Sequence, residues 1–181
     1  MAKTQKHGSP YTSAAISLHW AIGVLMIFNL AFGWMLAADY LKGGGLVGIH
    51  KSIGMLVLIL AATRLTYRLT HTYPGYVPMP QPLKLAAQVN HYLLYALIFW
   101  MPLTGFLMSN AGGRPTVFFG LFTIPPVIGF NPELGKQLFG LHEAGMWAAF
   151  VLISLHIGAA LFHQFYRKDG TLSRMLPFLP K

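Results

Sequence analysis

The fold of this chain is decided by the stretch LHEAGMWAAFVLISLHIGAALFH, residues 141–163. Its single charged side chain, Glu143, lies at the beginning, and almost all the rest is apolar. His142 and His156 are 14 residues apart, close to four helical turns, so they lie on one helix face at depths about 21 Å apart. A polar side chain inside a bilayer is costly and is usually kept for a function. The stretch therefore predicts a membrane-spanning helix that carries a histidine at each of two depths.

The composition extends this prediction to the whole chain. Of 181 residues, 55% are hydrophobic and only 9% are charged, whereas soluble domains carry about 25% charged residues. Long apolar runs occur at about 14–36, 46–68, 85–108 and 141–165, and each meets the roughly 20 residues that a membrane span needs. We therefore predict an all-α integral membrane protein, a single domain over residues 1–181 built as a four-helix transmembrane bundle.

The charge distribution predicts the orientation of this bundle. If the N-terminus faces the cytoplasm, the outer segments carry four basic residues and the inner segments carry the other nine. The positive-inside rule then favours an N-in/C-in arrangement, which explains most of the net charge of +9 without a nucleic-acid partner. The first apolar run is too long for a signal-peptide core, and we expect it to remain as a signal anchor. The chain has no cysteine, which excludes disulfides and covalent haem attachment.

Helix direction sorts four intramembrane histidines into two pairs. In the N-in orientation His19 lies near the cytoplasmic side of an outward helix, and His50 lies near the outer side of an inward helix. The matching depths on the last helix pair His50 with His142 and His19 with His156. Each pair offers two imidazole nitrogens to opposite faces of one porphyrin iron. The sequence thus predicts two non-covalent, bis-histidine haems, which suit electron transfer because no open position remains on the iron.

Small residues lie one turn beyond each predicted ligand, where a flat macrocycle against the helix would need room. They are Gly23, Gly54, Gly145, and Ala159 with Ala160. Small residues also promote ordinary packing between transmembrane helices, so this alternative stays open.

Two basic side chains are candidates for holding haem propionates. Arg64 follows His50 by 14 residues and is expected to face the bundle at the depth of the inner haem. Lys51, beside His50, is expected to serve the outer haem. The alternative is that both side chains extend to the membrane interface.

Further histidines lie towards the cytoplasmic side. His163 is seven residues beyond His156 and is a candidate proton donor or acceptor for a quinone near the inner haem, with Ser17 close by. An interfacial histidine is the alternative. His91 has no partner left at its depth, and helix packing is the expected role, with a hydrogen-bonding or quinone role as the alternative.

The outer side carries an apolar stretch and four basic residues. Residues 117–122 are too short to span a membrane and form either a partial lid at the outer interface or an unstructured loop. The basic residues could attract a small anion to the outer haem, or they are ordinary loop charges. They are Lys42, Lys51, Arg114 and Lys136.

Five motifs in this order resemble bacterial cytochrome b561, a family of di-haem, four-helix cytochromes of the inner membrane. The motifs are ISLHW (16–20), GIHKSIG (48–54), LHE (141–143), LHIGAALFH (155–163) and KDGTLSRM (168–175). The resemblance extends from about Tyr11 to Met175. Many relatives have a second histidine where this chain has Gln164, so proton delivery there could differ.

The resemblance implies two b-type haems ligated by His19, His50, His142 and His156. It also implies a ubiquinone site with Ser17 and His163 on the cytoplasmic side, and superoxide as donor to the outer haem. Two alternatives stay open: a cytochrome b membrane anchor that takes electrons from a partner dehydrogenase, and a haem-free transporter or structural bundle whose histidines are helix contacts.

Overall fold

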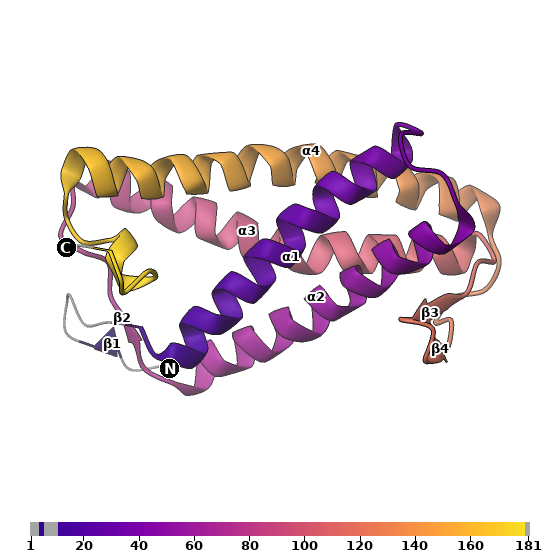
Figure 1. Cartoon of the computed structure of the whole chain (residues 1–181), viewed down its shortest axis with the longest axis horizontal. Coiled ribbons are helices and arrows are strands. Elements are labelled where there is room, and N and C mark those ends of the chain that lie inside the picture. The colour runs from indigo at the N-terminus through magenta and orange to yellow at the C-terminus, as the bar shows by residue number, and fades with distance from the viewer. Residues whose placement is uncertain (1–3, 6–10, 180–181) are drawn as a thin grey trace.

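The computed structural model describes residues 4–5 and 11–179, and four long helices make up most of it (Figure 1). They are α1 (Ser13–Ala37), α2 (Gly44–Thr70), α3 (Gln81–Ala111) and α4 (Pro132–Phe162). All four are long and apolar enough to cross a membrane, so the predicted four-helix bundle is confirmed. Lys3, Lys6 and Lys181, which contribute to the predicted orientation, lie outside the described residues.

Local capping explains where α1 and α4 begin. The Thr12 hydroxyl accepts a hydrogen bond from the Ala15 amide (3.3 Å) at the start of α1. The Asn131 side chain accepts from the Leu134 amide (3.1 Å), and Pro132 occupies the first turn of α4. These signals start α4 nine residues before the apolar run predicted from hydropathy, because the first turns carry polar residues and extend beyond the apolar part.

Consecutive helices pack side by side in the bundle. α1 packs on α2, α2 on α3, and α3 on α4. Figure 1 shows both chain termini at one end of the bundle, which we call the terminal end, and strands β3 and β4 at the opposite end, which we call the hairpin end. His19 and His156 lie towards the terminal end, and His50 and His142 towards the hairpin end.

The buried core lies between these two levels of histidines. Its members come from all four helices and are Ile22, Met26, Ile53, Val57, Leu97, Met101 and Ala149. Many other large apolar side chains point outward and are exposed, including Val24, Phe28 and Phe150. This distribution is typical of a bundle whose outer surface faces lipid rather than water.

Short strands close the two ends of the bundle. At the hairpin end, β3 (Thr116–Phe118) pairs antiparallel with β4 (Phe122–Ile124). Phe119 and Gly120 turn the chain with positive φ values of 46° and 76°. At the terminal end, β1 (Thr4–Gln5) pairs parallel with β2 (Tyr73–Pro74).

The β3–β4 hairpin is fastened to α2 through one side chain. The single Ser52 hydroxyl proton lies within reach of two carbonyl oxygens, those of Gly48 (2.8 Å) and Val117 (3.0 Å), and the hydroxyl oxygen accepts from the Phe119 amide (2.9 Å). Of the two alternatives for residues 117–122, the structure shows a segment docked on the end of the bundle rather than an unstructured loop.

The chain turns back on itself after α4. A π-helical turn, η1 (His163–Arg167), is followed by Lys168 with φ 49° and a 3₁₀ turn, η2 (Leu172–Arg174). The Trp20 indole donates to the Met175 carbonyl oxygen (2.8 Å), which ties this C-terminal segment to α1.

Candidate functional site

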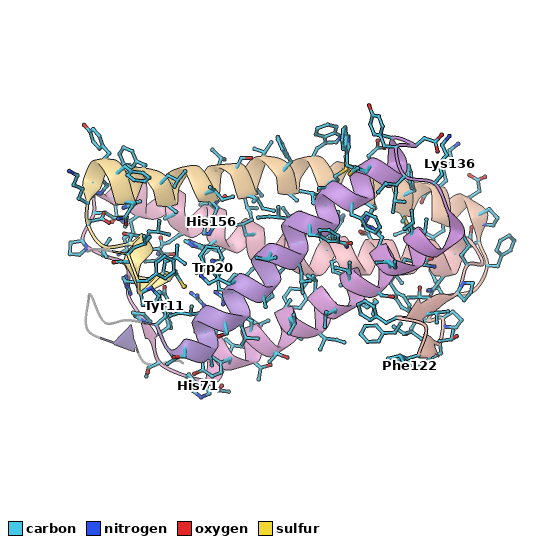
Figure 2. All side chains as sticks on the ribbon, viewed as in Figure 1. Tyr11, Trp20, His71, Phe122, Lys136 and His156 are labelled. Carbon is cyan, nitrogen blue, oxygen red and sulfur yellow. The ribbon has the colours of Figure 1, made fainter. Side chains whose placement is uncertain are left out.

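The histidines that were predicted to form pairs from their depth in the membrane lie close together in the structure. The ring centres of His19 and His156 are 6.0 Å apart and their planes are inclined by 69°. The ring centres of His50 and His142 are 6.3 Å apart, with an inclination of 88°. His156 is labelled inside the bundle in Figure 2, with Trp20 nearby in the view. Each pair joins α4 to a helix that does not pack closely against it within the described residues, α1 in one case and α2 in the other.

These separations fit two imidazoles on opposite faces of one metal ion. An imidazole nitrogen binds a first-row metal at about 2.0 Å, and the ring centre lies roughly 1 Å further away, so trans ligands have ring centres about 6 Å apart. In the part of the chain that the structure describes, no group of three or more His, Cys, Asp or Glu could hold a metal ion. Two nitrogens alone suit an iron whose other ligands come from a porphyrin.

Two glycines on neighbouring helices give the hairpin-end imidazoles their space. A Cβ on Gly33 of α1 would lie 2.6 Å from Cε1 of His50, and one on Gly105 of α3 would lie 3.1 Å from Cε1 of His142. Only a glycine lets the backbone approach the first ring this closely. The sequence carried a usable signal, because Gly33 follows His19 by 14 residues and therefore shares its helix face at the other depth.

The small residues predicted to make room beside each ligand behave differently from one another. A Cβ on Gly23 would meet no atom within 4 Å, so the structure leaves space there. A Cβ on Gly145 would instead lie 2.7 Å from the Met101 sulfur and 3.0 Å from the Trp100 ring. The expectation of haem space is wrong for Gly145, because this glycine lets α4 pack tightly on α3.

The hairpin-end histidines differ in their hydrogen bonds. The Thr104 hydroxyl donates to the Trp100 carbonyl oxygen (2.7 Å), so its oxygen can accept from Nδ1 of His142 (3.0 Å). That bond leaves Nε2 of His142 available to a metal. Nδ1 of His50 is buried and has no hydrogen-bond partner, while the Asn29 amide donates to the His50 carbonyl oxygen (3.2 Å). An unsatisfied buried ring nitrogen is a further sign that this pair receives a group from outside the chain.

A third histidine stands beside the terminal-end pair. The ring centre of His91 lies 5.3 Å from that of His156. Nδ1 of His91 donates to the Ala87 carbonyl oxygen (2.6 Å) and lies 3.5 Å from the Tyr76 hydroxyl. The bond to Ala87 lies within α3 itself. The proximity to His156 was missed because it depends on how α3 is rotated about its axis.

Arg64 lies near the terminal-end histidines. Arg64 Nη1 donates to the Ala15 carbonyl oxygen (2.8 Å), and Arg64 is close enough to His19 and His156 to interact with them electrostatically. It lines an open pocket at the terminal end, into which Tyr95 also projects, and the buried Tyr95 hydroxyl lacks a hydrogen-bond partner. This pocket has the donors that a carboxylate would need.

Lys51 is already engaged by protein groups. Its amine donates to the Ser109 hydroxyl (3.1 Å) and to the Pro115 carbonyl oxygen (2.5 Å), both next to the hairpin. The side chain that we expected to hold a propionate of the outer haem thus links α2 to the end of α3. Arg114 lies within electrostatic reach of Lys51, whereas Lys42 forms an exposed ion pair with Asp39 (2.7 Å).

Ser17 and His163 have contrasting surroundings. Ser17 is exposed on α1. His163 is buried, and its Nδ1 lies 2.6 Å from an Asp169 carboxylate oxygen and 3.3 Å from the Thr171 hydroxyl. No hydrogen bond joins Ser17 to His163 among the described residues. The sequence did not indicate a role for Asp169, because its contact with His163 depends on the turn after α4.

Asp169 carries a stabilised negative charge. Its burial raises the pKa of the carboxyl group, but hydrogen bonds from Thr171, Arg167 and His163 outweigh this effect and hold the pKa below its usual value. The carboxylate is therefore ionised at neutral pH beside the His163 ring.

Comparison with known proteins identifies the family of the chain. Residues 10–178 match the family described as prokaryotic cytochrome b561. The chain is 33% identical over 170 residues to cytochrome b561 homolog 2 of Escherichia coli (strain K12), covering 92% of this chain and 90% of that protein. It is 30% identical over 175 residues to the probable superoxide oxidase CybB of Yersinia pestis, covering 92% and 96%. With four helices able to span a membrane and a match over nearly its whole length, the chain belongs to the prokaryotic cytochrome b561 family of haem-containing membrane electron-transfer proteins.

Proposed function

We propose that this protein carries electrons from superoxide, at the hairpin end, through two bis-histidine b-type haems to ubiquinone at the terminal end. The observation that carries the proposal is the pair of histidine contacts at 6.0 Å and 6.3 Å, at two depths along α4. When bound, each haem would supply a one-electron iron couple without an open coordination position. The protein would be a multi-pass protein of the bacterial inner membrane, with the terminal end in the cytoplasm.

The chain's own residues have defined tasks in this proposal. His19 and His156 would hold the inner haem, and His50 and His142 the outer one. Arg64 would receive a propionate of the inner haem in the terminal-end pocket. The apolar core between the two levels would exclude water and hold the two haems apart.

Superoxide is the preferred donor for two reasons: the positive charge near the outer histidine pair, and the name of one relative. Lys51 and Arg114 form a positive pair near His50, which would raise the local concentration of a small anion. A relative covering 92% of the chain is named a probable superoxide oxidase.

At the other end, His163 and Ser17 would serve ubiquinone, with His163 as the proton donor. A membrane anchor that receives electrons from a partner dehydrogenase is the second candidate, since other relatives are named only as cytochromes b561.

The haem assignment is tested by reduced-minus-oxidised spectra and the haem-to-protein ratio of the purified protein. We expect a ratio of about two, because each bis-histidine pair holds one iron. His50→Ala and His142→Ala should remove the same haem, and His19→Ala and His156→Ala the other. The control is His163→Gln, a histidine outside both pairs and outside the lining of the terminal-end pocket, which should retain both haems. If His50→Ala and His156→Ala lost the same spectral component, the pairing would be wrong.

The donor is tested separately by quinone reduction with superoxide as the reductant. The purified haem-loaded protein should form quinol by itself. If it forms quinol only after a partner dehydrogenase is added, the second candidate function holds instead. A colourless protein would support the haem-free bundle.

A further inference from the structure

The C-terminal turn builds a small polar cluster around His163. Oδ2 of Asp169 lies 2.6 Å from Nδ1 of His163 and accepts from Nε of Arg167 at 2.9 Å. Oδ1 accepts from the Thr171 amide at 3.1 Å and from the Thr171 hydroxyl at 2.6 Å. The side chains of His163 and Asp169 are only 11% and 16% exposed, so this pair is largely shielded from water.

The backbone of the turn is shaped so that Asp169 can reach back to α4. The last helical turn widens into the π-helical segment η1, which begins at His163. Lys168 and Gly170 then adopt positive φ values of 49° and 73° and reverse the chain direction. A non-glycine residue is uncommon in this conformation, and π-helical turns are frequently found at functional sites. The folded turn thus brings the Asp169 carboxylate into hydrogen-bond contact with Nδ1 of His163.

We infer that Asp169 is a positioning residue for proton transfer: it binds the Nδ1–H group of His163, so that Nε2 is the atom that gives a proton to the quinone. The inference rests on the proposed function, in which His163 serves the quinone. An acceptor-only carboxylate at Nδ1 requires the proton on that nitrogen, so a proton given up by the ring to the quinone must leave from Nε2. The same arrangement orients catalytic histidines in unrelated proteins.

The proton balance of the reaction is met by this arrangement. Reduction of a quinone to a quinol takes two electrons, which come from two one-electron donor molecules, and two protons, one on each carbonyl oxygen. The Nε2–H bond of His163 breaks as one quinone O–H bond forms, leaving a neutral ring that keeps Nδ1–H on Asp169. Cytoplasmic water supplies the other proton and then reloads Nε2.

The other charged groups near this end do not replace Asp169. Arg167 bonds the same carboxylate and also donates to the Pro78 carbonyl oxygen (3.4 Å). On the neighbouring elements, His91 and Tyr76 lie against each other, and Arg174 stands over the Tyr11 ring (5.2 Å). Arg68 stands over the Tyr73 ring (4.6 Å). The sequence has only four acidic residues, and Asp169 is the one hydrogen-bonded to His163 within the described structure.

The test is the Asp169→Asn variant of the haem-loaded protein, with ubiquinone-1 as acceptor and the haem reoxidation rate followed from pH 5 to 9. The asparagine oxygen can still accept from Thr171, but its NH₂ group would donate to Nδ1 and move the ring proton to Nε2. Donation from Nε2 would then leave an anionic ring. We expect reoxidation to be about 10- to 100-fold slower at pH 8. The loss of rate should be larger at pH 9 than at pH 5, where protons from bulk water are abundant, and the haem content should be unchanged.

The controls separate positioning from folding. Asp39→Asn makes the same chemical change in the exposed Asp39–Lys42 pair at the other end, and it should keep the parent profile. His163→Gln should retain both haems and slow reoxidation at every pH. If Asp169→Asn does not bind haem, Asp169→Glu replaces it, and its rate should be lower than that of the parent by a similar factor at all pH values.

The outcomes separate the role of Asp169 from the proposed function of the whole protein. A parent protein that reduces no quinone at any pH contradicts the proposed function. A parent that reduces quinone, combined with an Asp169→Asn profile equal to that of the parent, overturns the role of Asp169 and leaves the proposed function standing. For Asp169→Glu, a rate and profile equal to the parent would overturn it as well.

Discussion

Gly33 shows how much of the hairpin-end site depends on a single missing side chain. The α1 backbone lies so close to the His50 ring that even one methyl group would overlap with it. In the proposed haem site the His50 ring would have to keep its orientation to bind iron, so the glycine would contribute to the site without offering any ligand atom.

We predict that Gly33→Ala displaces the His50 ring and removes the outer haem while the inner haem remains. The physical reason is the 2.6 Å separation between the added Cβ and Cε1 of His50, which interiors packed to crystal density do not tolerate. The measurement is the haem-to-protein ratio, expected to fall from about two to about one. Gly140→Ala on α4 is the matched control, since a Cβ there meets nothing within 4 Å. Retention of two haems in Gly33→Ala would mean that the ring adapts.

At the scale of elements, the β3–β4 hairpin depends on α2 for its position. The tip residues Leu121 and Phe122 are exposed (77% and 57%) and contribute little burial, so the Ser52 bonds are a main attachment (Figure 2 labels Phe122 at this end). Hydropathy predicted an apolar segment here but not its strands, because three-residue strands are specified by pairing and turn geometry rather than by periodicity.

We predict that Ser52→Ala loosens the hairpin without unfolding the bundle. The change leaves the Phe119 amide and the Val117 carbonyl oxygen without their partner, at a cost of about 1–3 kcal/mol in local stability. Amide hydrogen exchange at residues 116–124 should become faster by about 5- to 100-fold. Thr63→Ala, which removes an exposed hydroxyl bonded to the Ile59 carbonyl oxygen on the same helix, should leave this exchange unchanged. Equal exchange in both variants would assign the attachment to other contacts.

At the scale of the whole molecule, helix direction accounts for what the sequence could predict. Knowing only that successive spans reverse direction was enough to bring His19 to His156 and His50 to His142. The position of His91 against His156, the role of Gly33 and the Asp169–His163 bond were missed. The first two depend on rotation of helices about their axes, and the third depends on a turn with positive φ values at Lys168 and Gly170. Hydropathy and spacing do not give the helix rotation or the turn geometry, although the 14-residue spacing of Gly33 from His19 could have indicated which helix face Gly33 occupies.

The orientation in the membrane is predicted to be N-in/C-in, and the lack of native cysteine makes it easy to measure. We predict that Lys42→Cys, at the hairpin end, reacts with a membrane-impermeant maleimide in intact spheroplasts, whereas Lys168→Cys, at the terminal end, reacts only after lysis. Both positions are exposed in the structure, so access to the reagent and not burial decides the result. The opposite labelling pattern would mean that the bundle has the opposite orientation, with most of its basic residues outside, against the positive-inside rule.

The placement of one histidine of each pair on α4 also has a consequence for how the protein responds to heat and to changes in bilayer thickness. The spacing between the two levels is set by fourteen residues of a single continuous helix, whose length is held by its internal hydrogen bonds. Tilting or sliding of α1 and α2 would alter how each pair closes, but it would hardly alter the distance between the two levels along α4. α4 thus fixes the spacing between the two levels. In the proposed function, electron transfer between the two haems should therefore be less sensitive to membrane composition than electron transfer at either end of the bundle.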